Sequence, residues 1–523
     1  MASKVLIERN TYHDSVTLMS LSSKMNSIEG VEQAVVTMAT QMNKELLENI
    51  GLLTDEAKES TGNDLIIALI TDTDERAEEV MELIKSELTS KMAKKEKDKD
   101  QTAKTLNSAL NLMPGANLAI ISVPGTYAVR EASLALKKGM HVMLFSDNVS
   151  IEDEKVLKET GRDKGLFVMG PDCGTAIINR SGLCFANKVS EGGIGLVAAS
   201  GTGLQEVTVQ IDRLGYGITQ AIGTGGRDLH ESIGGIMMLQ GLKALENDKK
   251  TKVITLISKP PAPIVQDKIL AEVKKCRKPV VVCFLDGDAQ AVEAAGATFS
   301  PTLIDAARKS VKLLDPQAVI ETEITDGVQR WITAEKAKLV DSQQDIRGLF
   351  CGGTLTAEAL SIIRTTGKTV KSNVAKKVEE KLSDITYSVG HTLLDMGDDE
   401  FTKGKPHPMI EPSLRNERIL QEAKDPKTAV LLLDFELGFG AHEDPVGVTL
   451  DTIKLARDEA AQAGRYLPVV AYICGTSKDK QDYQQQQKKL QSVGVYVADS
   501  NEMATRTAAK LVEKEVNKIE YAK

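Results

Sequence analysis

The chain has 523 residues, of which 41% are hydrophobic but only 4% aromatic, so its cores are built mainly from aliphatic side chains. Lys and Arg number 65 and Asp and Glu 74, for a net charge of −9, which is not typical of a general nucleic-acid binder. No apolar run is long enough to span a membrane, and the N-terminus lacks the apolar core of a secretory signal. The six cysteines are scattered without a C-x-x-C pair, which indicates a reducing compartment, so we expect a cytoplasmic protein.

Residues 1–112 are predicted to form a small α/β domain with strands at 4–8, 31–37 and 64–70 and helices between and after them. The third strand, DLIIALI, is apolar throughout and should be buried on both faces. The charged run KKEKDKDQ at 94–101 cannot be buried and indicates a helix end or linker near the domain boundary.

From about residue 113 onward, predicted strands alternate with helices, which favours βαβ units and parallel sheets. We expect a second domain at 113–190, a third at 191–335 and a fourth at 345–523. The fourth loosely repeats the third: the turn at 351–354 echoes the turn at 200–203, and each follows a strand and opens a helix. The repeat predicts two similar open sheets, with an acidic, His-bearing insert at about 387–415 in the second.

Four glycine-bearing turns follow predicted strands. In a parallel sheet such turns share one edge, where backbone N–H groups and helix N-termini can bind an anion. Taken singly, each turn is explained by chain reversal; taken together, they predict a phosphate or nucleotide site. Neither G-x-G-x-x-G nor a Walker A motif is present, so a standard dinucleotide or P-loop site is excluded. The candidate binding residues in these turns are Pro124, Gly125, Gly170, Pro171, Cys173, Ser200, Gly201, Thr202, Gly225 and Gly226.

The insert places His391 and His407 near Asp395, a composition that suits proton transfer or a divalent metal but also an ordinary polar loop. No ligand spacing matches a zinc site, so no metal residues are assigned. Cys173 and Cys351 each sit in a strand-end turn and are candidate nucleophiles, although buried, unreactive thiols are commoner.

Residues from about 116 to 310 resemble the α subunit of succinyl-CoA synthetase, and the whole chain resembles the FdrA proteins, which are acyl-CoA synthetase-like. The synthetase-like pieces are Ser122-Val123-Pro124, Gly170-Pro171-Asp172-Cys173, Ser200-Gly201-Thr202 with Glu206, Gly217, and Gly223-Thr224-Gly225-Gly226. The FdrA-like pieces are 10–19, 145–149, 170–175, 225–229, 258–261, 395–399 and 406–410. The resemblance implies an α/β protein with a CoA-binding Rossmann-like domain at 113–190 and two flavodoxin-like domains of the succinyl-CoA-synthetase type, behind the small N-terminal α/β domain.

The chain departs from the synthetases where their chemistry lies. The stretch 296–301, which corresponds to their phosphorylated-histidine turn, contains no His, and the place of their partner carboxylate reads Ser258-Lys259-Pro260-Pro261. No ATP-grasp domain is evident. We therefore do not expect the chain to run a phosphohistidine relay alone. An anion-binding edge that carries Lys259 and Arg227 suits an acyl or carbamoyl phosphate.

The FdrA resemblance implies one component of a multi-subunit carbamoyltransferase in purine (allantoin) breakdown, which exchanges oxamate plus carbamoyl phosphate with oxalurate. Partner subunits would complete its site. The expected catalytic residues are Lys259, Arg227, His391 and His407, and the expected ligands are CoA, ATP or an acyl or carbamoyl phosphate.

Two alternatives remain open. One is a nucleoside-triphosphate-driven acyl-CoA ligase, with CoA at Pro124, Gly125, Ser146 and Asn148 and with a phosphorylated histidine elsewhere, such as His391, His407 or His442. The other is a non-catalytic scaffold or regulator that kept the fold. Neither nucleic acid nor membrane is an expected partner.

Overall fold

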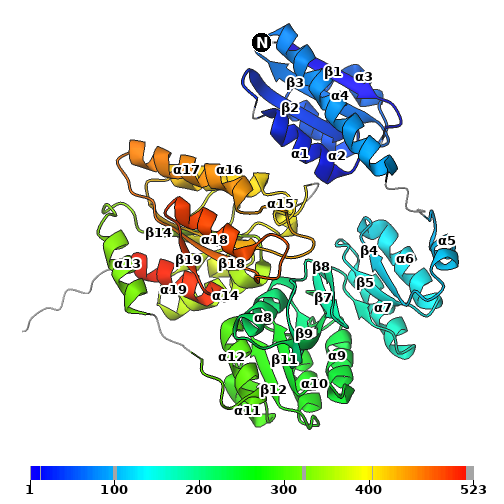
Figure 1. Cartoon of the computed structure of the whole chain (residues 1–523), viewed down its shortest axis with the longest axis vertical. Helices are drawn as coiled ribbons and strands as arrows, with labels where there is room; N and C mark the ends of the chain where they lie inside the picture. The colour runs from blue at the N-terminus through cyan, green and yellow to red at the C-terminus, as the bar shows by residue number, and fades with distance from the viewer. Residues whose placement is uncertain are drawn as a thin grey trace, which may run out of the picture. The chain divides into compact units, whose positions relative to one another are not determined.

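The computed structural model describes residues 2–11, 13–26, 28–97, 103–320, 325–402 and 405–513. The chain divides into two compact units (Figure 1). The first is Met1–Ala109 with Asp399–Leu414, and the second is Leu110–Asp398 with Arg415–Lys523. The predicted linker at 94–101 is described only in part: a helix extends to Lys97, and residues 98–102 lie outside the described residues.

The first unit is built around an antiparallel sheet with strand order β1-β3-β2. Side chains of β3 alternate between two cores, one shared with α1 and α4 and the other with α2 and α3. The prediction that this strand is buried on both faces is therefore confirmed, because successive residues of β3 point to opposite faces of the sheet and both faces are covered. The elements are β1 (Ala2–Glu8), α1 (Ser15–Asn26), β2 (Val31–Met38), α2 (Gln41–Asn49), α3 (Asp55–Glu59), β3 (Leu65–Thr71), α4 (Asp74–Lys97) and, in the 399–414 segment, α15 (Asp399–Thr402).

The second unit begins with a small parallel sheet of order β4-β5-β6. Its strands alternate with helices, and Ser150 caps the N-terminus of α7 by accepting the N–H of Asp153. The elements are α5 (Leu106–Leu112), β4 (Leu118–Ile121), α6 (Gly125–Lys137), β5 (His141–Leu144), α7 (Ile151–Asp163) and β6 (Val168–Met169).

A seven-stranded sheet follows, with order β13-β12-β11-β9-β10-β7-β8. Five of its strands are parallel and, numbered along the chain from β9, run 2-1-3-4-5, which is the flavodoxin-like order. A hairpin, β7 and β8, extends the sheet by pairing antiparallel with β10, although its residues lie in the segment predicted as the second domain. The elements are β7 (Thr175–Ile178), β8 (Ser181–Cys184), β9 (Glu191–Ala199), α8 (Gly201–Arg213), β10 (Ile218–Gly223), α9 (Ile236–Asn247), β11 (Val253–Ser258), α10 (Pro263–Val273), β12 (Val280–Phe284), α11 (Ala289–Ala294), β13 (Thr298–Phe299), α12 (Leu303–Leu314) and α13 (Asp326–Lys336).

The last sheet has six parallel strands in the order β15-β16-β14-β17-β18-β19. Apart from the edge strand β15, it repeats the order 2-1-3-4-5 from β14 onward, which confirms the predicted repeat of two similar open sheets. The elements are β14 (Asp345–Phe350), α14 (Gly353–Thr365), β15 (Val370–Lys371), η1 (Val378–Glu380), β16 (His391–Asp395), α16 (Ser413–Lys424), β17 (Thr428–Glu436), α17 (Gly447–Gln462), β18 (Val469–Cys474), α18 (Tyr483–Ser492), β19 (Tyr496–Ala498) and α19 (Asn501–Leu511).

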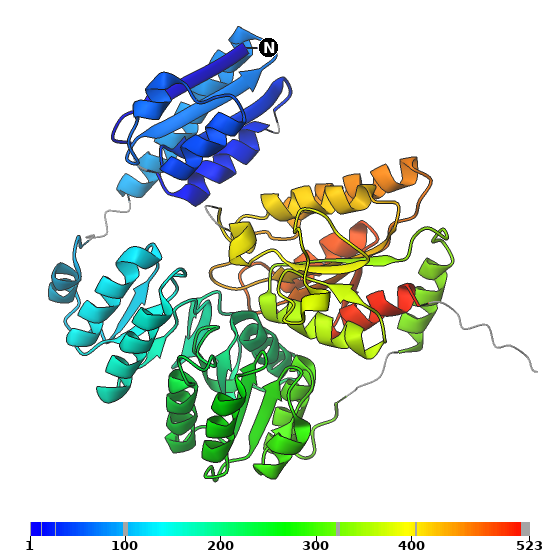
Figure 2. The same cartoon turned by 180° about the vertical axis from the view of Figure 1, so that it is seen from behind.

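The seven-stranded and six-stranded sheets share one hydrophobic core, built mainly from Ile, Leu, Val and Ala, and the helices α8, α12, α14 and α19 pack within it (Figure 2). The predicted α/β class with parallel sheets is thus confirmed. Among the described residues, no helix is both long and apolar enough to cross a membrane.

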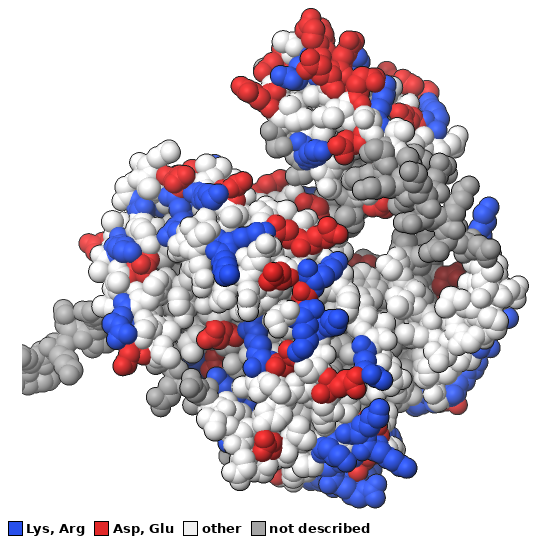
Figure 3. Space-filling view, in the orientation of Figure 1, with Lys and Arg blue, Asp and Glu red and all other residues white. Residues whose placement is uncertain are grey.

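Charge is unevenly distributed over the surface (Figure 3). Acidic side chains gather on the first unit, whose outer helix α4 carries Asp74, Glu75, Glu78, Glu79 and Glu82. Basic side chains gather where α9 and α10 end, at 249–252 and 274–278. The net charge of −9 therefore says little about any one site.

Candidate functional site

The two related sheets meet at their ligand-binding edges. In the 2-1-3-4-5 order, ligands bind beyond the carboxyl ends of the first and third strands, where the direction of winding reverses. These strands are β9 and β11 in one sheet and β14 and β17 in the other. The helices that follow β9 and β14 touch: Ser200, the N-cap of α8, donates a hydrogen bond to Thr354 of α14 at 2.6 Å, and Thr202 accepts the N–H of Thr354 at 3.3 Å. Two helix N-termini, each with a partial positive charge, therefore lie together.

Lys259 and Asp395 converge on the start of α14. Lys259 follows β11, and Asp395 is the last residue of β16. A Cβ atom added at Gly353 would lie 2.3 Å from Asp395 Oδ2 and 3.2 Å from Lys259 Nζ. Only glycine leaves room for both groups at the helix N-terminus. We call Lys259, Gly353 and Asp395 the strand-end site.

A second lysine strengthens the positive charge of this edge. Lys376 donates to the carbonyl of Pro260 at 3.0 Å, and burial together with the charge of Lys259 lowers the pKa of Lys376. The charge of Lys259 disfavours the charged form of Lys376, and a bound anion offsets such an effect. The strand-end site is therefore suited to a phosphate or carboxylate ligand.

Asp395 is held rigidly in place. Its backbone N–H donates to the Asn373 amide oxygen at 3.0 Å, and Asn373 Nδ2 donates to the Asp395 carbonyl at 3.0 Å. Its Oδ1 accepts the N–H of Gly397 at 3.0 Å, and the residue is 6% exposed. Burial raises the pKa of Asp395 to about 7, against the opposing effect of the Lys259 charge.

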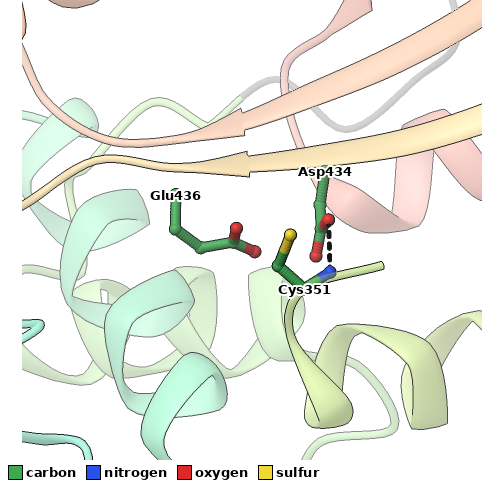
Figure 4. Close-up of side chains that lie close together, drawn as sticks. All are labelled: Cys351, Asp434 and Glu436. Carbon is green, nitrogen blue, oxygen red and sulfur yellow. Dashed lines mark hydrogen bonds between the residues drawn. The ribbon is translucent and has the colours of Figure 1, made fainter. Parts of the chain in front are cut away.

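Behind the turn at 351–353 lies a buried cluster of a thiol and two carboxyl groups (Figure 4). Cys351 directly follows β14, and Asp434 and Glu436 lie in the last three residues of β17, with possible ligand atoms within 4.8 Å of one another. Asp434 accepts the N–H groups of Cys351 at 2.7 Å and Gly352 at 3.0 Å. This carboxylate therefore fixes the turn that leads into α14.

The Arg415 guanidinium lies against this cluster. Its Nη1 lies 2.9 Å from Cys351 Sγ and 3.3 Å from Asp434 Oδ1. Burial and the charge of Asp434 raise the pKa of Glu436 well above its ordinary value. With a guanidinium supplying the positive charge, we interpret the cluster as a buried ion network, not a metal site.

The glycine turns predicted to share one edge do come together, but largely by packing against one another. A Cβ atom at Gly125 would lie 2.4 Å from the carbonyl of Asn148, and one at Gly225 would lie 2.3 Å from that of Pro171. The N–H of Asp172 donates to the carbonyl of Ser146 at 3.0 Å. These contacts explain the glycines by close backbone approach, so the binding roles of Pro124, Gly125, Ser146, Asn148, Gly170, Pro171, Gly225 and Gly226 remain proposals.

One polar atom at this edge has no partner. Thr175 Oγ1 is buried and makes no hydrogen bond, and it would lie 3.6 Å from a Cβ atom at Gly201, the first residue of α8. A buried hydroxyl without a partner is costly, and a ligand at this helix N-terminus would supply one.

Arg227 belongs to a buried charge network that joins α7 to the loop after β10. Its guanidinium lies 3.0 Å from Glu154 and donates to the carbonyl of Val149 at 2.8 Å. Next to it, the fully buried Lys158 pairs with both Glu154 and Asp228. These partners give Arg227 a structural role, and its contact with a ligand stays a prediction.

Of the histidines predicted to be catalytic, His391 is not part of the strand-end site. His391 begins β16, at the opposite end of the strand from Asp395, and its Nδ1 accepts the N–H of Ile346 at 3.1 Å. His407 belongs to the first unit, where burial lowers its pKa to about 4. Their catalytic roles remain untested proposals.

The thiol candidates are poor nucleophiles. Cys173 is buried, which raises its pKa to about 12, and burial raises the pKa of Cys351 well above its ordinary value. Thiolate is the reactive form, so neither thiol is activated here.

Sequence reasoning missed Asn373 and Lys376, which bond to Asp395 and Pro260, and it grouped Asp395 with the histidines of the insert instead of placing it at this edge. For Asp395 a signal existed, since an acid directly after a predicted strand in a parallel sheet lies at the ligand edge. Lys376 and Asn373 come from the irregular segment after β15 and carry no local pattern.

Three family models match the chain. One described as CoA-ligase matches residues 349–511, one described as a CoA binding domain matches residues 189–286, and one described as the AllF heavy metal-associated domain matches residues 1–105. The CoA-binding match falls where the sequence predicted a ligase-like domain, so the domain boundaries remain a prediction. The fold and these matches define a protein of the acyl-CoA synthetase-like, succinyl-CoA ligase superfamily.

The closer relationship comes from whole-chain comparison. The chain is 48% identical over 505 residues to the uncharacterized protein YahF of Escherichia coli K12, covering 96% of this chain and 97% of YahF. It belongs to the same family as YahF. It is also 25% identical over 222 residues to subunit alpha 1 of an ADP-forming succinate–CoA ligase of Archaeoglobus fulgidus, covering 41% of this chain and 74% of that subunit. A solved ATP citrate lyase from Methanothrix soehngenii is 17% identical with a TM-score of 0.35, covering 62% of this chain and 56% of that one.

The heavy-metal description of the N-terminal match does not suit the residues of this chain. The first cysteine is Cys173, so residues 1–105 offer no thiolate for a soft metal ion. Among the described residues of this unit, no cluster of three metal-ligating side chains occurs.

Proposed function

We propose that the protein is the FdrA-type subunit of a heteromeric enzyme that transfers a carbamoyl or acyl group by way of its phosphate. Its preferred reaction is the exchange of oxamate and carbamoyl phosphate with oxalurate and phosphate, in purine catabolism. The strand-end site carries this proposal. Two helix N-termini, Lys259 and Lys376 provide positive charge for a phosphoryl group, and Asp395 provides a carboxyl group beside it.

Two further observations support this choice. The N-terminal match bears the AllF name, which fits a role in allantoin breakdown. The turn at 296–301, where the synthetases carry their phosphorylated histidine, has none here. Lys259 takes the place of a carboxylate, which favours binding a phosphorylated substrate over handling a phosphohistidine.

The test is a carbamoyl-transfer assay on the chain together with its candidate partner subunits, supplied with carbamoyl phosphate and oxamate. We expect product to form, and Lys259→Met to raise the KM for carbamoyl phosphate by about 10- to 100-fold, because a charge-assisted contact to the phosphate contributes about 1.5–3 kcal/mol. Lys454→Met is the matched control, since Lys454 is half exposed and pairs only with the exposed Asp451. Absence of transfer with every partner combination contradicts the proposal.

A second candidate is a nucleoside-triphosphate-dependent acyl-CoA ligase, which the CoA-ligase and CoA-binding matches favour. In this case His230 is a further phosphate acceptor to consider. It lies in the loop after β10, and partial burial, with the charges of Lys376 and Arg227, lowers its pKa. Incubation with labelled ATP, followed by analysis for acid-labile phosphate, distinguishes the two functions: a phosphoprotein that loses its label in His230→Asn supports the ligase.

A further inference from the structure

We propose that Asp395 is the acid–base residue of the strand-end site, taking the proton from the amide nitrogen that receives the carbamoyl group and passing it to the departing phosphate. This inference rests on the proposed function and adds to it a residue and a proton path. No role for Asp395 follows from the resemblance to the synthetases, whose matching pieces end before residue 310.

The geometry gives Asp395 a fixed orientation. Asn373 holds its backbone on both sides, and Gly397 holds Oδ1. The other oxygen, Oδ2, is the one that faces the start of α14 at Gly353, where Lys259 Nζ also ends. A carboxyl group with one oxygen anchored and the other beside the anion-binding helix terminus is positioned for proton transfer to a bound reactant.

The reaction needs such a group because an amide nitrogen is a weak nucleophile. In the transfer, a bond forms between this nitrogen and the carbamoyl carbon, and the carbon–oxygen bond to phosphate breaks, with the electron pair leaving on phosphate. The nitrogen loses a proton, which Asp395 accepts and returns to phosphate. The carbamoyl phosphate dianion and a monoanionic acceptor thus become a monoanionic product and hydrogen phosphate, so charge balances. In the reverse direction Asp395 protonates the leaving nitrogen.

The groups around Asp395 allow it to accept a proton in the transfer reaction and to donate one in the reverse reaction near neutral pH. Burial raises its pKa to about 7, the charges of Asp398 in its own loop and Asp434 on β17 act in the same direction, and Lys259 after β11 opposes them. From β14 the neighbouring group is the Cys351 thiol, which stays protonated. A carboxyl group that titrates near the working pH both accepts and donates readily.

The first experiment compares Asp395→Asn with the wild type in the complete complex. The amide oxygen can still accept the Gly397 N–H, so the fold is expected to be retained. We expect kcat to fall by about 10²- to 10⁴-fold, the usual contribution of an acid–base group, while the KM for carbamoyl phosphate changes little. Wild-type kcat in the transfer direction should rise as pH increases through about 7, and this rise should be absent from the variant.

Asp451→Asn serves as the control, because Asp451 is 92% exposed on α17 and should leave both kcat and the pH profile unchanged. If Asp395→Asn keeps the wild-type kcat and pH profile, the assignment is overturned while the proposed function stands. If the wild-type complex shows no transfer at all, the proposed function fails, and a binding measurement then decides the role of Asp395.

That measurement is calorimetry of inorganic phosphate binding to the full chain in two buffers of different ionisation enthalpy. Binding of the anion next to Asp395 should be accompanied by proton uptake in the wild type and by less uptake in Asp395→Asn, with affinities within about threefold of each other. Equal proton uptake in both proteins, or no phosphate binding in either, overturns the assignment.

Discussion

The seven-stranded and six-stranded sheets have the same strand order but opposite chemistry at their ligand edges. In the first, Ser200 follows β9 and Lys259 follows β11; in the second, β16 ends at Asp395 and β17 at Glu436. At these strand ends, the first sheet supplies a hydroxyl and an ammonium group and the second supplies carboxyl groups. Because the two edges meet at α8 and α14, Lys259 of one sheet and Asp395 of the other lie together at the start of α14.

The strongest effect on stability should come from breaking the buried ion network of Cys351, Asp434, Glu436 and Arg415 at the edge of the six-stranded sheet. Arg415→Met removes the charge partner of the buried Asp434, so we expect a loss of about 3–5 kcal/mol in the free energy of unfolding. Arg506→Met is the control: this side chain is 42% exposed and pairs with Glu502, and its loss should cost less than about 1 kcal/mol. Chemical denaturation measures both. Equal stability of the two variants would show that the network is not an energetic unit.

A second prediction tests the difference between the two sheets by adding one methyl group at the N-terminus of each helix, α14 and α8. Gly353→Ala places a carbon 2.3 Å from Asp395, whereas Gly201→Ala meets no atom closer than 3.6 Å. We expect Gly353→Ala to cost about 1–3 kcal/mol and to lose phosphate binding, and Gly201→Ala to be nearly neutral. Thermal unfolding and phosphate calorimetry test the pair. Similar results for both glycines would mean that the two helix starts are equally open.

A third prediction concerns Glu358, a buried acid on α14, and the buried Glu206 on α8 whose charge acts on it. Burial, with the charge of Glu206, raises the pKa of Glu358 from 4.5 to about 8. Because the pKa of Glu358 is higher in the folded than in the unfolded chain, the stability that Glu358 contributes is complete below about pH 4.5. It is lost as the pH rises to about 8. Between about pH 6.5 and 8 the wild type should lose about 1–2 kcal/mol more than Glu358→Gln.

Thermal midpoints at several pH values give this difference. Parallel curves for the wild type and Glu358→Gln would indicate that Glu358 does not titrate in this range.

We expect only a small change in transfer activity when the turn at 351–353 is made more like the turn at 200–202. Cys351→Ser gives the second turn the residue that Ser200 provides in the first. Because the Cys351 thiol is protonated at neutral pH, it contributes no nucleophile, and transfer activity should stay within about threefold of the wild type. A loss of activity above 10²-fold, with the fold intact by circular dichroism, would assign the thiol a chemical role.

Local patterns were enough to predict most of the architecture. Apolar runs such as 64–70 and 116–123 mark strands, and their alternation with helices predicts parallel sheets because parallel strands need crossover connections. The hairpin at 175–184 escaped prediction, since its two short strands owe their pairing to β10 of the next sheet. The site was foreseen in part: Lys259 and the turn at 200–202 lie at the proposed edge, whereas His391 lies at the other end of its strand.

Residue types at neighbouring positions are enough to predict the helices and strands, the repeat of the two sheets and the positive charge of the edge after β11. Which residues far apart in the sequence come into contact depends on the fold of the whole chain. Gly353, Asp395 and Lys259 are separated by up to 136 residues (395 − 259) yet converge at one helix start. Conversely, Arg227 is drawn into a pair with Glu154. Such meetings follow from sheet order and helix packing, which short-range patterns do not encode.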